Sequence, residues 1–240
     1  MRINEVINRP LEEGVDDPHI FKAIFLAGGP GSGKSYVSGK LTGQKHVRTG
    51  LKVVNSDDIF EYMLKKQGLK ANADTIFSPR GQEIRTKAKE ISKNREDIYL
   101  DGRLGLIIDG TGKNVENVRI QKEILEGLGY DTMMLFINTN EDVAIERDRL
   151  RPRSIGAEEV SKMWKQVQEN IMKFQQLFGA KDFHVVDNSG GLEDADRAAQ
   201  FEKVEMNIDK FLAVPPKRHE ARKWIQAAKK DKATNNTLDI

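Results

Sequence analysis

One stretch near the start of the chain has the residue types and spacing of a phosphate-binding loop. It runs from Gly28 to Ser35, GGPGSGKS, and matches G-x-x-x-x-G-K-[ST] at every fixed position. Glycines allow the backbone to approach phosphate oxygens and to direct several N–H groups at them. We expect Lys34 to reach the β- and γ-phosphates of a nucleoside triphosphate, and the Ser35 hydroxyl to hold Mg²⁺.

The residues on both sides of this loop predict the elements that must position it. Residues 23–27, AIFLA, are typical of a short buried strand, and residues 36–41 of the start of a helix. A glycine-rich turn that binds nothing is the alternative, which the agreement of motif and flanks disfavours. The predicted nucleotide contacts are Gly29, Gly31, Ser32, Gly33, Lys34, Ser35 and Tyr36.

Composition narrows the class of protein. The 240 residues include 39 basic and 37 acidic side chains, a net charge of +2, and no cysteine. Disulfides and thiolate metal sites are thereby excluded, and the charge gives no general argument for binding nucleic acid. The charged N-terminus and the absence of any apolar run near ~20 residues predict a cytoplasmic protein without a membrane segment.

Strands and helices are predicted to alternate along the chain, which indicates an α/β fold. We expect a parallel five-stranded sheet with helices on both faces and a helical lid. The predicted strands are residues 23–27, 51–55, 104–108, 132–137 and 183–186. Residues 68–80 are expected to form a loop, and one long helix is expected after Gly156.

Acidic and amide side chains follow three of the predicted strands. These residues are Asp57, Asp58, Asp109, Asp187 and Asn188. Because right-handed crossovers bring the carboxyl ends of parallel strands to one edge, we expect them to share the ligand site with the loop.

The remaining pattern favours a kinase over the other phosphate-loop proteins. The chain lacks the Asn-Lys-x-Asp of GTPases, an LSGGQ-like signature and the acidic pair of motors. Asp57 could accept the proton of an acceptor hydroxyl. Helix capping is the alternative for Asp57 and Asp58, but capping requires only one of them.

Two arginines are candidates for a lid over the phosphates. Arg147 and Arg151 are predicted to lie one turn apart on a helix capped by Asn140, where they could neutralise charge on the transferring phosphoryl group. A solvated helix face is the alternative interpretation.

Four segments together resemble a known group of enzymes. GGPGSGKS, VVNSDDIF, IIDGTGKN and ERDRLRPRSI are similar to the kinase domain of phage-type polynucleotide 5′-kinases, and more broadly to the zeta-toxin (AAA_33-like) group of P-loop kinases. The resemblance implies that Asp57 is the general base and that Asp109, with Asp58, serves the acceptor side. It also implies that Arg147 and Arg151 are catalytic, the second contacting donor phosphates.

The resemblance covers about residues 22–190 and implies a division of the chain. We expect an N-terminal extension (1–20), a P-loop kinase domain (21–212) and a basic C-terminal tail (213–240). A solvated, partly disordered tail is favoured over a short basic helix around Trp224.

The resemblance favours a polynucleotide kinase-like activity on a 5′-hydroxyl acceptor, and a UDP-amino sugar or other small metabolite is the alternative acceptor. Polynucleotide kinases place an arginine soon after the acidic pair, where this chain has Ile59 and Phe60. The basic stretch from Arg85 to Arg95 and the lysines of the tail could guide a phosphate backbone. A non-catalytic nucleotide-binding module of a larger assembly is a further alternative. The partners expected for the kinase are ATP with Mg²⁺ and this hydroxyl acceptor.

Overall fold

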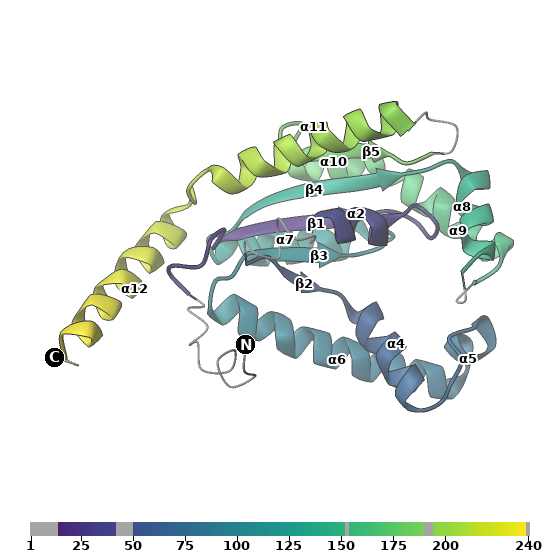
Figure 1. Ribbon diagram of the computed structural model, residues 1–240, viewed down its shortest axis with the longest axis horizontal. Coiled ribbons are helices and arrows are strands. Elements are labelled where there is room, and N and C mark those ends of the chain that lie inside the picture. Colours follow the sequence, from purple (N-terminus) through teal and green to yellow (C-terminus); the bar gives the residue numbers. More distant parts are fainter. Residues whose placement is uncertain (1–13, 42–49, 152–153, 190–193, 239–240) are drawn as a thin grey trace, which may run out of the picture.

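The computed structural model describes residues 14–41, 50–151, 154–189 and 194–238, in which helices surround a parallel sheet (Figure 1). The strands are β1 (Lys22–Ala27), β2 (Lys52–Val54), β3 (Leu106–Asp109), β4 (Asp131–Asn138) and β5 (Phe183–Asp187). The helices are α2 (Lys34–Leu41), α4 (Ser56–Lys66), α5 (Ala73–Phe77), α6 (Pro79–Asp101), α7 (Val115–Gly127), α8 (Glu141–Arg149), α9 (Ala157–Gln168), α10 (Ile171–Phe178), α11 (Asp194–Ala213) and α12 (His219–Leu238).

The sheet has the order β2-β3-β1-β4-β5, and each neighbouring pair is parallel. The central strand β1 pairs with β3 on one side and with β4 on the other, so Phe25 lies between Ile108 and Met134. The glycine loop therefore leaves the middle of the sheet at its carboxyl edge. The predicted α/β fold with a five-stranded parallel sheet is confirmed.

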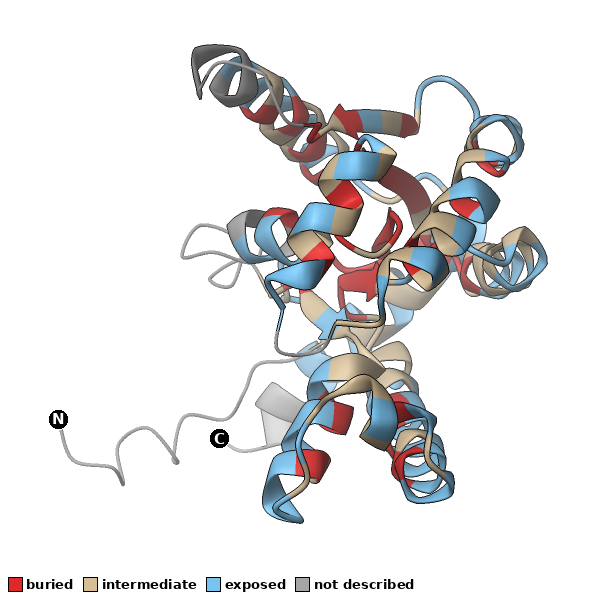
Figure 2. Cartoon of the chain, turned by 90° about the vertical axis from the view of Figure 1, so that its right-hand side faces the viewer, coloured by how far each residue is buried: buried red, intermediate tan, exposed pale blue. Residues whose placement is uncertain are grey.

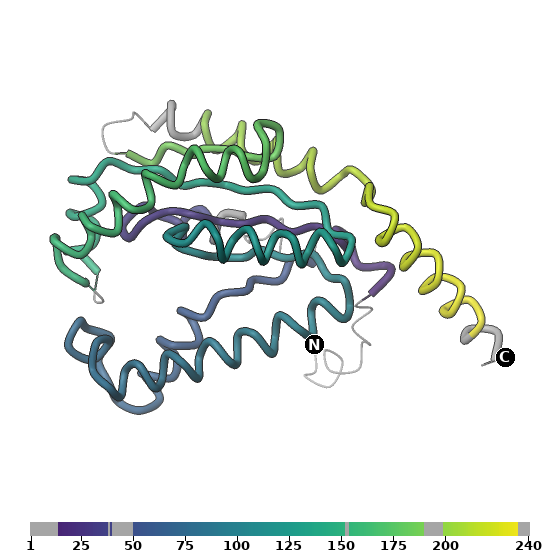
Figure 3. The backbone as a smooth tube through the Cα atoms, turned by 180° about the vertical axis from the view of Figure 1, so that it is seen from behind, coloured from purple at the N-terminus to yellow at the C-terminus, as the bar shows by residue number. Residues whose placement is uncertain are grey.

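Alternate residues of β1 pack against helices on opposite faces of the sheet. Phe25 and Ala27 belong to a core with Phe174 and Phe178 of α10, and Figure 3 shows α7 lying across the same face. Ile24 and Leu26 contribute to a second core, with residues of α2 and α11. Burial on both faces explains the nearly continuous apolar sequence of the strand. None of the helices within the described ranges has the length and apolar character needed to cross a membrane.

Helices α4, α5 and α6 form an arm with a small core of its own. Phe60, Leu64, Ile76 and Ile84 are buried in it. Figure 2 shows buried segments of this arm apart from those of the sheet. The loop expected at residues 68–80 is found only at 68–72, because α5 and the start of α6 occupy most of the rest. The Asn72 side chain caps α5 by accepting from Thr75 N, and the Ser78 side chain caps α6 by accepting from Gly81 N. These polar residues therefore begin helices here.

The helix expected after Gly156 is in fact two helices, α9 and α10. The chain bends at Asn170, whose buried side chain donates hydrogen bonds to the carbonyl oxygens of Gly112 and Lys113, both at 3.0 Å. A tertiary contact therefore interrupts an otherwise continuous helical pattern.

Helix α8 also ends earlier than expected, at Arg149. The buried carboxylate of Asp148 accepts hydrogen bonds from Ser154 Oγ at 2.8 Å and from the backbone N of Ile155 at 3.0 Å and Gly156 at 3.3 Å. These bonds turn the chain away from the helix axis. Arg151 therefore lies beyond the α-helix, and Arg153 lies outside the described residues.

The described part of the tail is not disordered as expected but forms the helix α12, the alternative expected around Trp224, and one face of this helix packs on the domain while most of its residues stay exposed. Ala221 is fully buried, and Trp224 meets Phe21 edge to face with ring centres 5.5 Å apart. Arg218 Nε donates to Tyr130 O at 3.0 Å. The three-residue spacing of Ala221 and Trp224 gives the helix an apolar stripe despite its many lysines. Of the expected N-terminal extension, residues 1–13 lie outside the described residues.

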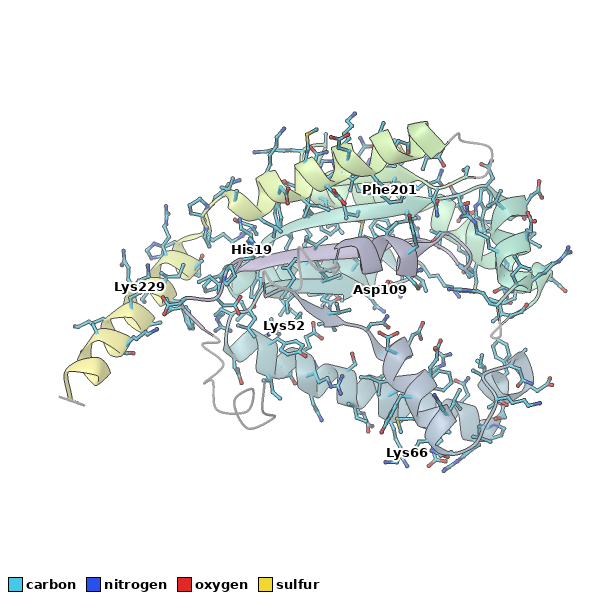
Figure 4. The ribbon with its side chains drawn as sticks, in the orientation of Figure 1. His19, Lys52, Lys66, Asp109, Phe201 and Lys229 are labelled. Carbon is cyan, nitrogen blue, oxygen red and sulfur yellow. The ribbon has the colours of Figure 1, made fainter. Side chains whose placement is uncertain are left out.

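Trp224→Ala should lower the free energy of unfolding by about 2–3 kcal/mol, somewhat less than is typical of a fully buried tryptophan. The lost contact is the one with Phe21, and denaturant unfolding followed by circular dichroism measures the effect. Lys229→Ala, at an exposed position farther along α12 (Figure 4), should change little. Equal stability of both variants would contradict the packing of α12 on the domain.

Candidate active site

The glycine loop between β1 and α2 is packed so closely that several of its positions exclude any side chain. Gly31 and Gly33 have φ values of 71° and 90°, which L-residues rarely adopt. A Cβ at Gly31 would lie 2.3 Å from Ala144 O of α8, and one at Gly33 would lie 2.2 Å from Asn188 Nδ2. The glycines of the motif therefore permit both the loop conformation and its contacts with α8 and the end of β5.

Lys34 lies over this loop at the start of α2. Its Nζ donates to Gly28 O at 2.7 Å, which holds the positive charge at the mouth of the loop. Ser32 Oγ is buried without a hydrogen-bond partner in the described part of the chain, whereas Ser35 and Tyr36 are exposed. A cation, an unsatisfied hydroxyl and the amino end of a helix thus converge, which is a fitting environment for phosphate groups.

Two side chains attach the loop to other elements. Asn188, 6% exposed, donates from Nδ2 to Ser32 O at 2.7 Å. Arg147 Nη1 donates to Asn188 O at 2.9 Å and to Gly31 O at 3.4 Å. Asn188 was predicted from the sequence only as a polar strand end, because no local pattern reports a hydrogen bond to the distant loop.

The two predicted lid arginines are placed differently from one another. Arg147 lies on α8 against the loop, where its guanidinium contacts carbonyl oxygens. Arg151 is exposed beyond the end of α8, and its backbone N donates to Asp148 O at 3.0 Å. The expected shared face of one α-helix is therefore wrong, and the catalytic roles of both arginines stay predictions.

Asn55 positions the acidic pair at the end of β2. Its Oδ1 accepts the backbone N of Asp57 at 2.7 Å and caps α4, while its Nδ2 donates to Asp109 Oδ2 at 3.0 Å. Because Asn55 performs the capping, the carboxylates of Asp57 and Asp58 are not needed for it. Asp57 Oδ1 lies 3.6 Å from Arg85 Nη1 of α6, a contact for which the sequence contained no signal.

Asp109 lies at the carboxyl end of β3 (Figure 4). Burial raises the pKa of its carboxyl group, the Lys34 ammonium lowers it, and the charges of Asp57 and Asp58 raise it again. Asp109 Oδ1 has no hydrogen-bond partner among the described residues. The structure therefore brings Asp109 within electrostatic reach of the loop lysine and of both residues of the acidic pair, as the strand ends predicted.

A cavity of about 290 Å³ opens beside Asp109. Neutral polar side chains line much of it, among them Ser56, Ser92, Asn117 and Gln121. Ser56, the first residue of α4 and the neighbour of Asp57 in the sequence, forms part of its wall. The site can thus offer a phosphate loop, a carboxylate and an adjoining space with hydrogen-bonding walls for a second molecule.

The family model for the zeta toxin matches residues 15–199. The chain belongs to the zeta toxin family. The match confirms the predicted group of P-loop kinases, of which the zeta toxins are part. Family and fold together indicate a phosphotransferase. No curated protein matches this zeta toxin family member significantly.

Solved structures share its fold at low sequence identity. One, from work on the PezAT chromosomal toxin–antitoxin system of Streptococcus pneumoniae, has a TM-score of 0.54 and 15% identity over 84% of this chain and 91% of the other. A protein of Chloroflexus aurantiacus, provisionally described as a kinase, has a TM-score of 0.52 and 15% sequence identity, and the match covers 78% of this chain and 98% of the other. A chain of the AvrRxo1-ORF1:ORF2 complex has a TM-score of 0.51 and 13% sequence identity, and the match covers 86% of this chain and 75% of the other.

Asn188→Ala should weaken ATP binding about five- to tenfold, because the lost hydrogen bond to Ser32 O is worth about 1–1.5 kcal/mol. Calorimetric titration with ATP measures the effect. Asn207→Ala is the control, since Asn207 lies on α11 and contacts His184. If the two variants bind ATP equally well, Asn188 does not hold the loop in its binding conformation.

Proposed function

We propose that this protein is an ATP- and Mg²⁺-dependent kinase that transfers the γ-phosphoryl group of ATP to a hydroxyl group. The observation that carries the proposal is that a phosphate-binding loop and a group of carboxylates suited to an acceptor lie at the same edge of the sheet. Lys34 lies on the phosphate loop, and Asp57 stands at the start of α4, joined through Asn55 to Asp109. A protein that only binds nucleotide would need the phosphate loop but not the carboxylates.

In this proposal the loop holds the donor. Backbone groups of Gly29 to Gly33 and the Lys34 ammonium bind the β- and γ-phosphates, and Tyr36 borders them. The Ser35 hydroxyl would ligate Mg²⁺, which supplies charge neutralisation on the phosphates. Among the described residues no group of three or more His, Cys, Asp or Glu side chains could hold a metal, so most ligands would come from the nucleotide and water.

Asp57 is the proposed general base. It is half-buried near Arg85, whereas Asp58 is exposed, and both follow Ser56, which lines the cavity beside Asp109. The acceptor oxygen bonds to the γ-phosphorus as the bond to the bridging oxygen breaks. The hydroxyl proton passes to Asp57, and ADP leaves. Arg147 and Arg151 would neutralise charge on the transferring group.

The acceptor is proposed to be a small phosphorylated molecule of the UDP-amino sugar type, with a 5′-hydroxyl polynucleotide as the second candidate. Family membership supports the first. In Figure 4 the basic helix α12, with Lys229, extends away from the end of the sheet opposite to Asp109, which removes the tail lysines as an argument for a polynucleotide track. The basic residues of α6 remain the observation in favour of the second.

Transfer of labelled phosphate from ATP should reach a UDP-amino sugar, and Lys34→Ala should reduce it by about 10²–10³ while the protein stays folded. A 5′-hydroxyl oligonucleotide is tested in parallel at low and moderate salt. Product from the oligonucleotide alone would select the polynucleotide candidate. ATP binding with no Lys34-dependent transfer to either acceptor would instead favour the non-catalytic module.

Asp57→Asn should reduce turnover by on the order of 10²–10⁴ without weakening ATP binding, because asparagine cannot take the proton. The cap of α4 should persist, since Asn55 accepts from the backbone of residue 57. Asp58→Asn is the matched control and should cost less. An inactive Asp58→Asn beside an active Asp57→Asn would reverse the assignment within the pair.

A further inference from the structure

Arg85 of α6 is held in place beside the proposed base. Its guanidinium carbon lies 4.4 Å from the ring centre of Phe60, and Phe60 is 1% exposed in the core that joins α4 to α6. A cation over an aromatic face is attracted to the ring. Because the ring is buried in this core, its contact with the guanidinium restrains the Arg85 side chain before any ligand arrives.

The contact between Arg85 and Asp57 leaves hydrogen-bonding capacity on the guanidinium. The distance from Arg85 Nη1 to Asp57 Oδ1 is 3.6 Å, longer than an N–H···O hydrogen bond. In the described part of the chain the Arg85 side chain donates no hydrogen bond, and it is 29% exposed. Arg80, on the same helix, instead donates to Glu83 at 2.6 Å and to Gln67 at 2.8 Å.

Arg85 is the cation beside Asp57 that an anionic acceptor would need at this edge of the sheet. Asp57, Asp58 and Asp109 make this edge of the sheet negative, so an anionic acceptor needs a cation close to the reacting hydroxyl. The planar guanidinium presents five N–H donors in a fork that matches phosphate oxygens. Its fixed position also reduces the entropy lost on binding.

We propose that Arg85 binds a phosphate group of the acceptor, next to the hydroxyl that Asp57 deprotonates. The inference rests on the proposed kinase function and narrows its substrates to molecules with phosphate near the reacting hydroxyl. A nucleotide sugar carries such a group in its pyrophosphate, and a polynucleotide carries one in its backbone. The shared chemistry is phosphate recognition by Arg85, and the experiment separates the two sources.

The test uses two matched pairs of acceptors, each with and without phosphate. They are UDP-N-acetylglucosamine against N-acetylglucosamine, and thymidine 3′-phosphate against thymidine. Binding to the full chain is measured by calorimetry with a non-hydrolysable ATP analogue present. In at least one pair the phosphorylated member should bind more tightly, and Arg85→Met should weaken that member by on the order of 10- to 100-fold. The unphosphorylated member should change by less than about twofold. The pair that responds identifies the source of the phosphate.

Arg80→Met is the matched control on the same helix and should leave both pairs unchanged. Arg85→Lys keeps the charge without the fork, so it should give an intermediate loss confined to the phosphorylated member. Thermal unfolding checks that each variant is folded. If Arg85→Met does not fold, Arg85→Lys carries the comparison.

An Arg85→Met variant that binds the phosphorylated member as tightly as the wild type would overturn the inference, and so would two other results. In one, the wild-type protein binds both members of each pair equally. In the other, the Arg85 variants lose both members alike, which would make Arg85 a structural partner of Asp57 only. Failure of the proposed function is separate, because it is read from Lys34-dependent phosphate transfer, whereas this test reads binding without transfer.

Discussion

The site depends on the close packing of the glycine loop against α8 and the end of β5. Side chains at Gly31 or Gly33 would collide with Ala144 O or with the Asn188 amide, so the loop and its supports require each other. The carbonyl oxygens of Gly31 and Ser32 accept hydrogen bonds from Arg147 and Asn188. These side chains bind carbonyl oxygens that would otherwise repel a phosphate, and they hold the loop in one conformation before a nucleotide binds.

A second constraint connects the loop to the acceptor side. Strand β2 has three residues, too few to orient the start of α4 by itself. Asn55 adds the missing restraint, because it caps α4 and donates to Asp109 on the neighbouring strand. Asp57 is therefore held relative to β3, which pairs directly with the central strand that carries the loop.

The opposite end of the sheet uses charge for a different purpose. Lys22, 2% exposed, pairs with Asp131 at 2.7 Å, and its burial lowers the lysine pKa. Arg218 pairs with Glu126 at 2.9 Å and helps to attach α12. A buried pair such as Lys22–Asp131 is costly to break and gives little net stability, whereas the Arg218–Glu126 pair is partly exposed. Anchoring charges thus lie at the amino ends of the strands, and the groups proposed for catalysis lie at the carboxyl ends.

The sequence alone determined the features that depend on neighbouring residues or on parallel strand geometry. The phosphate loop was predictable because strand, loop and helix are contiguous, and Asp57 and Asp109 because parallel strands end at one edge. Only the tertiary structure decided that Asn188 holds the loop across 156 positions, that Arg85 lies beside Asp57, and that Asp148 and Asn170 interrupt helices. Those contacts join elements far apart in the chain, and their energy comes from packing and hydrogen bonds that form only after the elements meet. The same reason explains α12. Its lysines predicted a solvent-exposed tail, but Ala221 and Trp224 pack against a core, including Phe21, that forms only when distant segments come together.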